Sequence, residues 1–190
     1  LPDSPVAIWW AADPSADPGT DPLGALADRR ITDSAAVTRG KTTALAGQCG
    51  VYAPGNTDLA WTRITQWRAL LAAALDQHPA RVRRVSVSAE RISPSADLLA
   101  AWLSLRLKVR VERHNSPGPG ITEVVLDTAD GPIRISRPDG KLATFTSPGR
   151  PDRPIALARR DVPHLLAEEL RHLDEDDTFA AVARKVGRQS

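Results

Sequence analysis

The 190-residue chain contains one cysteine, no methionine and no long apolar run. A single thiol, Cys49, cannot form an intramolecular disulfide, and the scarcity of cysteine favours a reducing compartment, so we expect a cytoplasmic protein. Apolar stretches such as residues 98–105 are far shorter than the ~20 residues that a membrane-spanning helix needs. We therefore expect no membrane partner.

Methionine is missing even at position 1, and no secretory signal opens the chain. We therefore expect a processed or trimmed chain that lacks an N-terminal part. A strong excess of one charge is also absent, because 25 Lys and Arg face 23 Asp and Glu. The pI near 9.0 rests on a net charge of only +2, so we expect no nucleic-acid partner. The composition, 42% hydrophobic and 25% charged, is that of a globular protein.

The first 50 residues favour the remainder of an α/β, Rossmann-like domain. Residues 5–10 (PVAIWW) are apolar and predict a buried strand of a parallel sheet. A loop over residues 11–22 follows, and Asp21 with Pro22 predicts the cap of a short helix. Residues 33–55 are rich in Thr, Ala and Gly and predict a linker with a marginal helix at 41–48.

Residues 51–190 predict a second domain that begins with one long helix. Thr57 or Asp58 is the expected N-cap, and the helix is expected to run to about Gln77, because Pro79 stops it. Its apolar stripe consists of Ala60, Ile64, Trp67, Leu71, Ala74 and Leu75. The small residues on its other side predict close approach by another element.

The sequence of the rest of this domain predicts several strands followed by two helices. Strands at 82–88 and 108–113 flank a helix opened by Ser93 or Ser95, which implies a right-handed βαβ crossover. Short strands at 121–127, 132–137 and 141–147 are joined by Asp-Gly turns and predict an antiparallel meander. Two helices close the chain: 162–173, with Asp161 as the expected cap, and 178–186, with Asp176 or Asp177 as the expected cap. The predicted fold class is α/β, with an α+β arrangement in the C-terminal half.

Three groups of residues suggest chemistry, each with a simpler alternative. Gly40-Lys41-Thr42 ends a loose phosphate-loop pattern (AAVTRGKT) that lacks the first glycine and has almost no apolar strand before it. The alternative is a flexible loop with a solvated Lys41. Cys49 has no evident histidine partner and is more simply interpreted as an incidental thiol. His164, Glu168 and His172 share helical spacing but fit the solvent face of an amphipathic helix, so we expect no metal and no cofactor.

One group of side chains suggests a contact with another protein. Trp61, Arg63 and Arg68 flank the first long helix, and Trp and Arg are the commonest anchors of interfaces. We name these three as the predicted partner-binding residues. The alternative for Trp61 is that it seals a core. The pairs Arg29-Arg30, Arg83-Arg84 and Arg159-Arg160 are expected at the surface.

Five segments in order resemble the OpcA family, the glucose-6-phosphate dehydrogenase assembly proteins of actinobacteria and cyanobacteria. They are LPDSPVAIWW (1–10), DPLGALADRRITDS (21–34), GNTDLAWTRITQWRALLAAALDQ (55–77), ISRPDGKLATFT (135–146) and PIALARRDVPHLLAEELRHLDEDDTFAAVA (154–183). The resemblance implies a non-catalytic protein that binds glucose-6-phosphate dehydrogenase and favours its active oligomer. It also implies a missing N-terminal segment as a second partner.

The composition agrees with an actinobacterial source, since arginine and alanine are abundant while lysine stands only at 41, 108, 141 and 185. An intramolecular thiol switch does not carry over, because Cys49 has no second cysteine. Two alternatives stay open. One is a nucleotide-binding enzyme using Gly40-Lys41-Thr42, and the other is a purely structural module that packs on the missing segment.

Overall fold

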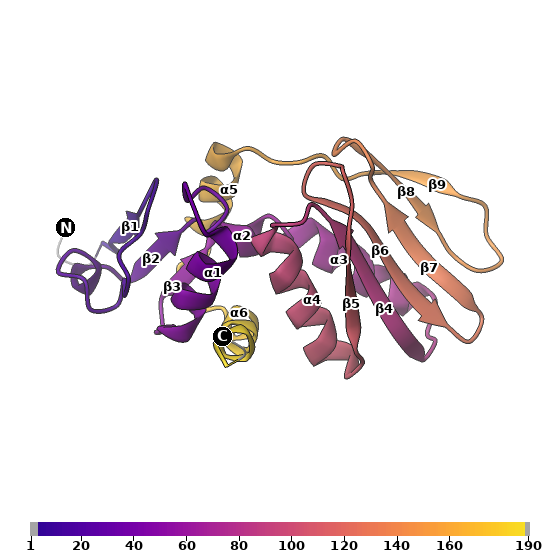
Figure 1. Ribbon diagram of the computed structural model, residues 1–190, viewed down its shortest axis with the longest axis horizontal. Coiled ribbons are helices and arrows are strands. Elements are labelled where there is room, and N and C mark those ends of the chain that lie inside the picture. Colours follow the sequence, from indigo (N-terminus) through magenta and orange to yellow (C-terminus); the bar gives the residue numbers. More distant parts are fainter. Residues whose placement is uncertain (1–3, 189–190) are drawn as a thin grey trace. The chain divides into compact units, whose positions relative to one another are not determined.

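The computed structural model describes residues 4–188, which form two compact units (Figure 1). Unit 1 combines residues 1–63 with residues 160–190, and unit 2 spans residues 64–159. Each unit mixes helices with a sheet, which confirms the predicted α/β class. The predicted domains 1–50 and 51–190 stay a prediction, and residues 1–3 and 189–190 of them lie outside the described residues. None of the helices in residues 4–188 is long and apolar enough to cross a membrane.

Unit 1 contains a three-stranded parallel sheet. Its strands are β1 (Ala7–Trp9), β2 (Arg29–Thr32) and β3 (Asn56–Asp58), in the order β1-β2-β3. The helix α1 (Lys41–Gly50) connects β2 to β3, so these elements form a βαβ unit. The marginal helix expected at 41–48 is therefore a full crossover helix.

The strand β1 confirms the extended run predicted at 5–10, but the prediction that it is buried is wrong. Trp9 is 40% exposed, and Val6 is exposed as well. The physical reason is position: among the described strands β1 pairs with β2 alone, so it is an edge strand. Apolar sequence by itself does not distinguish an edge strand from a central one.

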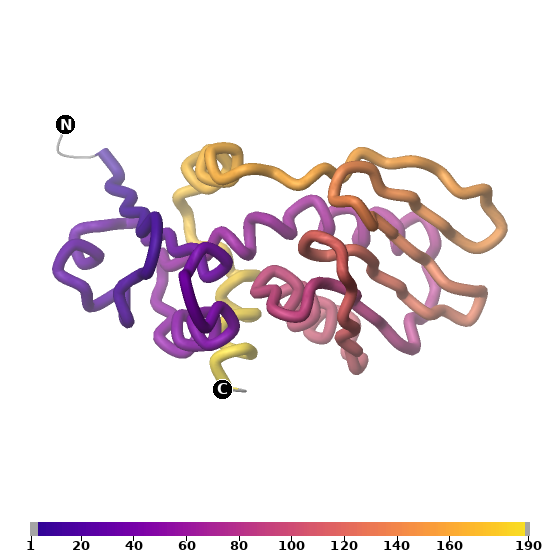
Figure 2. Tube along the Cα trace, turned by 45° about the horizontal axis from the view of Figure 1, so that its top comes forward, coloured from indigo at the N-terminus to yellow at the C-terminus, as the bar shows by residue number. Residues whose placement is uncertain are grey.

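The helices α5 (Val162–Glu169) and α6 (Asp177–Gly187) lie in the C-terminal part of the chain but belong to unit 1. The predicted caps are confirmed: Asp161 accepts a hydrogen bond from the backbone of His164, and Asp176 accepts one from Phe179. The helix α6 packs beside α1, as the trace shows (Figure 2). There the backbone of Gly187 lies so close to Cys49 that an added Cβ would be 2.8 Å from the Cys49 carbonyl oxygen.

The single helix predicted from residue 57 or 58 to residue 77 is divided in the structure. Asn56–Asp58 is strand β3, the short helix α2 covers Leu59–Thr62, and α3 begins anew at Thr65 and ends at Gln77. Asp58 caps α2 by accepting a hydrogen bond from Ala60 N. The break at residues 63–64 contains no Gly or Pro, so the sequence pattern offers no sign of it.

Unit 2 is built on a six-stranded sheet in the order β5-β4-β6-β7-β8-β9. Its elements are β4 (Val82–Ala89), α4 (Pro94–Leu107), β5 (Val111–Asn115), β6 (Ile121–Thr128), β7 (Gly131–Ser136), β8 (Leu142–Thr146) and β9 (Arg153–Ala156). The strands β4 and β5 are parallel and α4 joins them, while β6 to β9 form an antiparallel meander. Both the predicted βαβ unit and the predicted meander are confirmed.

The core of unit 2 follows the two periodicities expected from its sequence. Alternate residues of the strands are buried, and so are the apolar stripes of α3 and α4. The most deeply buried members are Trp67, Leu71, Val85, Val87, Leu98, Leu99, Leu103, Val124, Leu126, Ile133 and Ile135. Ser93 accepts a hydrogen bond from Ala96 N and caps α4, as predicted.

Candidate functional site

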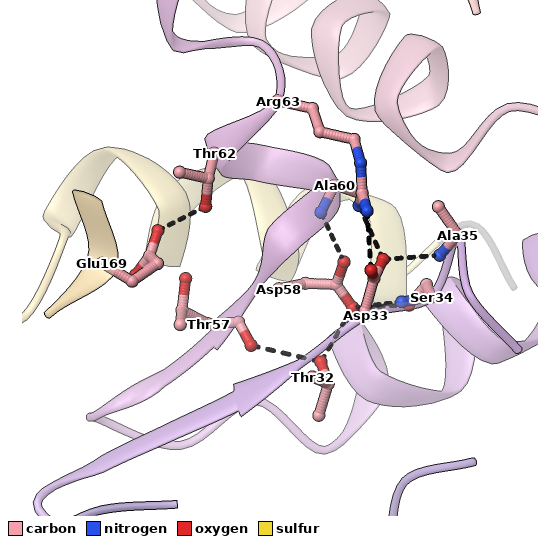
Figure 3. A network of polar contacts seen from close by, with 10 residues as sticks. All are labelled: Thr32, Asp33, Ser34, Ala35, Thr57, Asp58, Ala60, Thr62, Arg63 and Glu169. Carbon is pink, nitrogen blue, oxygen red and sulfur yellow. Dashed lines mark hydrogen bonds and ion pairs between the residues drawn. The ribbon is translucent and has the colours of Figure 1, made fainter. Parts of the chain in front are cut away.

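Polar side chains gather at the carboxyl ends of β2 and β3 in unit 1 (Figure 3). Thr32, Asp33 and Ser34 end the first strand, and Thr57 and Asp58 end the second; each is at most 3% exposed. In open α/β sheets, ligands bind at this edge, outside the carboxyl ends of the parallel strands. We therefore take this carboxyl-edge cluster as the candidate site.

Asp58 lies at the centre of the carboxyl-edge cluster (Figure 3). Its Oδ2 accepts hydrogen bonds from Ser34 N at 3.0 Å, Ser34 Oγ at 2.6 Å and Thr32 Oγ1 at 2.8 Å, while its Oδ1 accepts from Ala60 N at 2.8 Å. Burial raises the pKa of the Asp58 carboxyl, and the hydrogen bonds from the Ser34 hydroxyl, Ala60 N and the Thr32 hydroxyl act against the rise. The carboxylate thereby joins β2, β3 and α2.

Asp33 forms the second part of the cluster. Both of its carboxylate oxygens accept hydrogen bonds from the Arg63 guanidinium, each at 2.6 Å, and Oδ1 also accepts from Ala35 N at 3.1 Å. A two-pronged arginine–carboxylate pair fixes geometry as well as charge. The loop after β2 is therefore tied to the end of α2.

These contacts use two backbone donors at the start of the loop after β2. A phosphate-binding loop needs backbone N–H groups that point freely at the ligand. Here Ser34 N already donates to Asp58, and Ala35 N already donates to Asp33. Two buried carboxyl groups thus occupy donors of the loop and would repel a phosphate. The cluster acts as an internal clamp.

The motif Gly40-Lys41-Thr42 lies at the N-terminus of α1. The expectation that almost no apolar strand precedes this motif agrees with β2, which has four residues with Ile31 as its one apolar side chain, and the loop after β2 leads into α1. Gly40 has a left-handed backbone (φ 63°) and Lys41 begins the helix. The strand–loop–helix order of a phosphate loop is thus present, while two backbone donors at the start of the loop, Ser34 N and Ala35 N, are taken by Asp58 and Asp33.

Replacing Asp58 tests the clamp. An asparagine keeps the size of the side chain but places an N–H donor where the wild-type carboxylate faces only donors. We expect Asp58→Asn to lower the free energy of unfolding by about 2–3 kcal/mol. Denaturant unfolding followed by circular dichroism measures this, with Asp13→Asn, in an exposed loop of the same unit, as the control. An Asp58→Asn variant as stable as the control would refute the clamp.

A second buried network of unit 1 is not predicted by the sequence pattern. Arg29, expected at the surface, is 4% exposed, and its Nη2 lies 2.7 Å from Oε2 of Glu169, which is 7% exposed. Thr62 Oγ1 donates to the other oxygen of Glu169, and Arg29 Nη1 donates to the Asp174 carbonyl at 3.1 Å. The network connects β2 and α2 to α5, which lies more than 100 residues further along the chain. No local pattern signals such a pair.

The structure gives each predicted partner-binding residue a contact within its own unit. Trp61 is 2% exposed, its ring packs on Phe179, and its Nε1 donates to Asp176 at 2.7 Å. Arg63, 22% exposed, holds Asp33, and the half-buried Arg68 donates to Thr65 Oγ1 at 3.3 Å. Partner binding by these three residues stays a prediction.

The metal-like spacing of His164, Glu168 and His172 does not produce a common helix face, because α5 ends at Glu169, before His172. Glu168 pairs with Arg160, and His164 pairs with Asp161. Among residues 4–188 no group of three or more His, Cys, Asp or Glu side chains is placed to hold a metal ion.

Cys49 is buried under α6, and burial raises the pKa of its thiol to about 12, with the Asp58 carboxylate adding to the rise. The thiolate is the reactive form of cysteine, so this environment makes Cys49 unreactive. It lies on α1, away from any cysteine partner, since it is the single cysteine of the chain.

The fold and the cluster together define a two-unit α/β protein in which a parallel βαβ unit has its ligand-facing edge clamped by its own carboxylates. Two family models match the chain, and both describe a glucose-6-phosphate dehydrogenase subunit. The model of its C-terminal domain matches residues 54–183, and the model of its N-terminal domain matches residues 1–48. The chain therefore belongs to this family, the OpcA family that the sequence resembles.

A search of curated proteins gave no match. Among solved structures, the chain is similar to KijD10, a 3-ketoreductase from Actinomadura kijaniata solved in complex with TDP-benzene and NADP. The TM-score is 0.50 at 8% sequence identity, and the match covers 87% of this chain and 68% of that one. At this identity the similarity concerns the fold alone.

Proposed function

We propose that this chain is a non-catalytic protein that binds glucose-6-phosphate dehydrogenase and favours its active oligomer. The observation that carries the proposal is the match of two family models, both describing domains of a glucose-6-phosphate dehydrogenase subunit, to residues 1–48 and 54–183. A protein that binds the active oligomer more tightly than other states shifts the population towards it. A tenfold preference contributes about 1.4 kcal/mol.

The carboxyl-edge cluster supports a binding role over a catalytic one. In enzymes of this fold type, the carboxyl edge of the parallel strands receives the ligand. In unit 1 Asp33 and Asp58 engage the arginine, hydroxyl and amide donors of that edge, so its polar groups stabilise the chain itself. This arrangement agrees with a protein whose function depends on its outer surface.

We propose that the dehydrogenase contacts an apolar group in unit 1, formed by Val6, Trp9, Leu23 and Leu26. These large side chains are 40–70% exposed and lie on or beside the edge strand β1 and the short helix η1 (Gly24–Leu26). The ring of Trp10 would lie 3.3 Å from a Cβ added at Gly24, which places the strand and the short helix close together. Large apolar side chains that are exposed to this extent are typical of interaction sites.

Trp61, Arg63 and Arg68 remain the alternative contact residues. Arg63 and Arg68 keep part of their surface exposed. A segment of the same protein outside this sequence is the second proposed partner of the apolar group, because β1 offers one unpaired edge among the described strands.

Single substitutions show whether the dehydrogenase contacts the apolar group or the alternative contact residues. We expect Trp9→Ser to weaken binding to the dehydrogenase about thirtyfold, because a tryptophan at the centre of an interface is commonly worth about 2 kcal/mol. Leu26→Ser is expected to act in the same direction. Leu142→Ser removes a similarly exposed leucine from unit 2 and is the matched control. Affinities are measured by calorimetric titration of the purified chain into the dehydrogenase.

Binding that is unchanged by Trp9→Ser but lost in Arg63→Gln or Arg68→Gln would move the contact to the alternative residues. A longer version of the protein that covers Trp9 and still binds the dehydrogenase would assign the apolar group to the protein's own segment. Absence of any binding by the wild-type chain and by the longer version would overturn the proposed function.

A further inference from the structure

Unit 2 contains a large cavity that neither the family nor the proposed function explains. It encloses about 910 Å³ and is open to solvent. Its wall is built where α3 and α4 end and where β4 begins, so all of its residues belong to one unit. Cavities that bind small molecules have volumes of about 300–1,000 Å³.

The charged side chains that line this cavity are all basic. Arg81, Arg83, Arg106 and Lys108 line it, and no acidic side chain does. Both α3 and α4 end here, and each helix C-terminus contributes the equivalent of roughly half a negative charge. Arg81, Arg83 and Lys108 alone exceed the negative ends of both helices by about two charges. In the described part of the chain, Arg81, Arg83 and Lys108 have no ion pair with an acidic residue.

Lys108, which lines this cavity, has an unusual backbone conformation. Its φ of 56° places it in the left-handed region, and within residues 4–188 it is the only residue other than glycine with a positive φ. This position follows the last turn of α4, where glycine is the usual residue because it adopts the left-handed region without strain. A lysine there lines the cavity at a cost in backbone energy. Backbone strain of this kind is commonly retained at binding sites.

The remaining wall is apolar. Leu75, Val82, Leu107 and Val109 line the cavity. A bare inorganic anion would leave this surface exposed to water, whereas a ligand that combines an anionic group with a carbon skeleton would cover it. Arginine and lysine are the side chains that bind phosphate groups.

We propose that this basic cavity of unit 2 is a binding site for a small organic phosphate with at least two negative charges. Arg81, Arg83 and Lys108 bind the phosphate groups, and the apolar wall contacts the organic part. The site lies within unit 2 and is separate in residue composition from the apolar group of unit 1, so it goes beyond the proposed function.

The test uses calorimetric titration of the chain with ADP and with inorganic pyrophosphate at low salt. We expect both to bind and ADP to bind more tightly. Arg83→Ala and Lys108→Gly are each expected to weaken ADP binding about tenfold, because a hydrogen bond to a charged group is typically worth at least that factor. Arg91→Ala and Arg150→Ala, which remove exposed arginines elsewhere in unit 2, are the controls and should leave the affinity unchanged.

Lys108→Gly separates binding from folding. It relieves the left-handed strain, so the melting temperature is expected to stay equal or rise while the affinity falls. Lack of ADP binding, an equal loss in the control variants, or equal affinity for ADP and pyrophosphate would each contradict the proposal. A loss of dehydrogenase binding in Arg83→Ala and Lys108→Gly, with neither phosphate bound, would instead make the cavity a protein contact and overturn it.

Discussion

Glu169→Ala is expected to lower the free energy of unfolding by about 4 kcal/mol. The substitution leaves the Arg29 guanidinium buried at 4% exposure without its 2.7 Å partner. Removing one member of a buried ion pair typically costs about 3–5 kcal/mol, since the remaining charge has lost both water and its partner. In a chain of this size, this corresponds to a fall in melting temperature of about 10 °C. Thermal unfolding followed by circular dichroism measures it.

Two further variants show that the loss arises from the unpaired charge. Arg29→Met combined with Glu169→Leu removes both charges, and most of the stability is expected to return, because apolar replacements of a buried pair are often neutral. Asp13→Ala changes an exposed acid of the same unit and is expected to shift stability by less than about 0.5 kcal/mol. Glu169→Ala with the stability of Asp13→Ala would show that the pair does not support the fold.

The thiol of Cys49 is expected to react about a thousandfold more slowly in the folded protein than in the unfolded chain. Burial raises its pKa from 9.0 to about 12, and the folded thiol therefore carries about a thousandfold less thiolate near neutral pH. The rate is expected to rise about tenfold per pH unit up to that pKa, because the thiolate fraction does so. Absorbance with a disulfide reagent at about pH 8, with and without denaturant, measures both rates.

An exposed thiol on the same helix is the control for this experiment. Thr42→Cys in a Cys49→Ala background places a cysteine on the exposed first turn of α1 and is expected to react at the rate of a free thiol. Rapid labelling of native Cys49 would contradict the burial seen here. It would also reopen a redox role for this residue, which its environment under α6 argues against.

Much of the fold of unit 2 is predictable from residues that are close together in the sequence. The Asp-Gly turns and the alternation of apolar residues specify the antiparallel meander, because a hairpin is defined by residues next to each other in the chain. The caps Ser93, Asp161 and Asp176 are predictable for the same reason, since a cap bonds to a backbone only three residues away.

The features that the sequence pattern does not predict depend on long-range contacts. The α2–α3 break carries no helix-breaking residue, and the return of α5 and α6 to unit 1 depends on partners such as Arg29 and Glu169, 140 residues apart. The exposure of Trp9 depends on which strands neighbour β1. Helical or strand periodicity contains no information on any of these.

The carboxyl-edge cluster is predictable only in part. Thr32-Asp33-Ser34 and Thr57-Asp58 each follow or end an extended stretch, and polar residues at the carboxyl ends of parallel strands meet at one edge. The sequence pattern predicts Thr57 or Asp58 as a helix cap, and the structure shows Asp58 in that role, but the pattern indicates a linker for the residues before it. Without strand β3, Asp58 and Ser34 have no reason to be neighbours.

We propose that this chain acts by binding glucose-6-phosphate dehydrogenase. The most direct measurement is the mass of the purified dehydrogenase by light scattering as the chain is added, with enzyme activity followed in the same samples. We expect a complex of larger mass that is enriched in the active oligomer. We also expect the activity to rise and to level off at the same ratio of the two proteins as the mass does. Mass and activity that stay unchanged across the titration would contradict it.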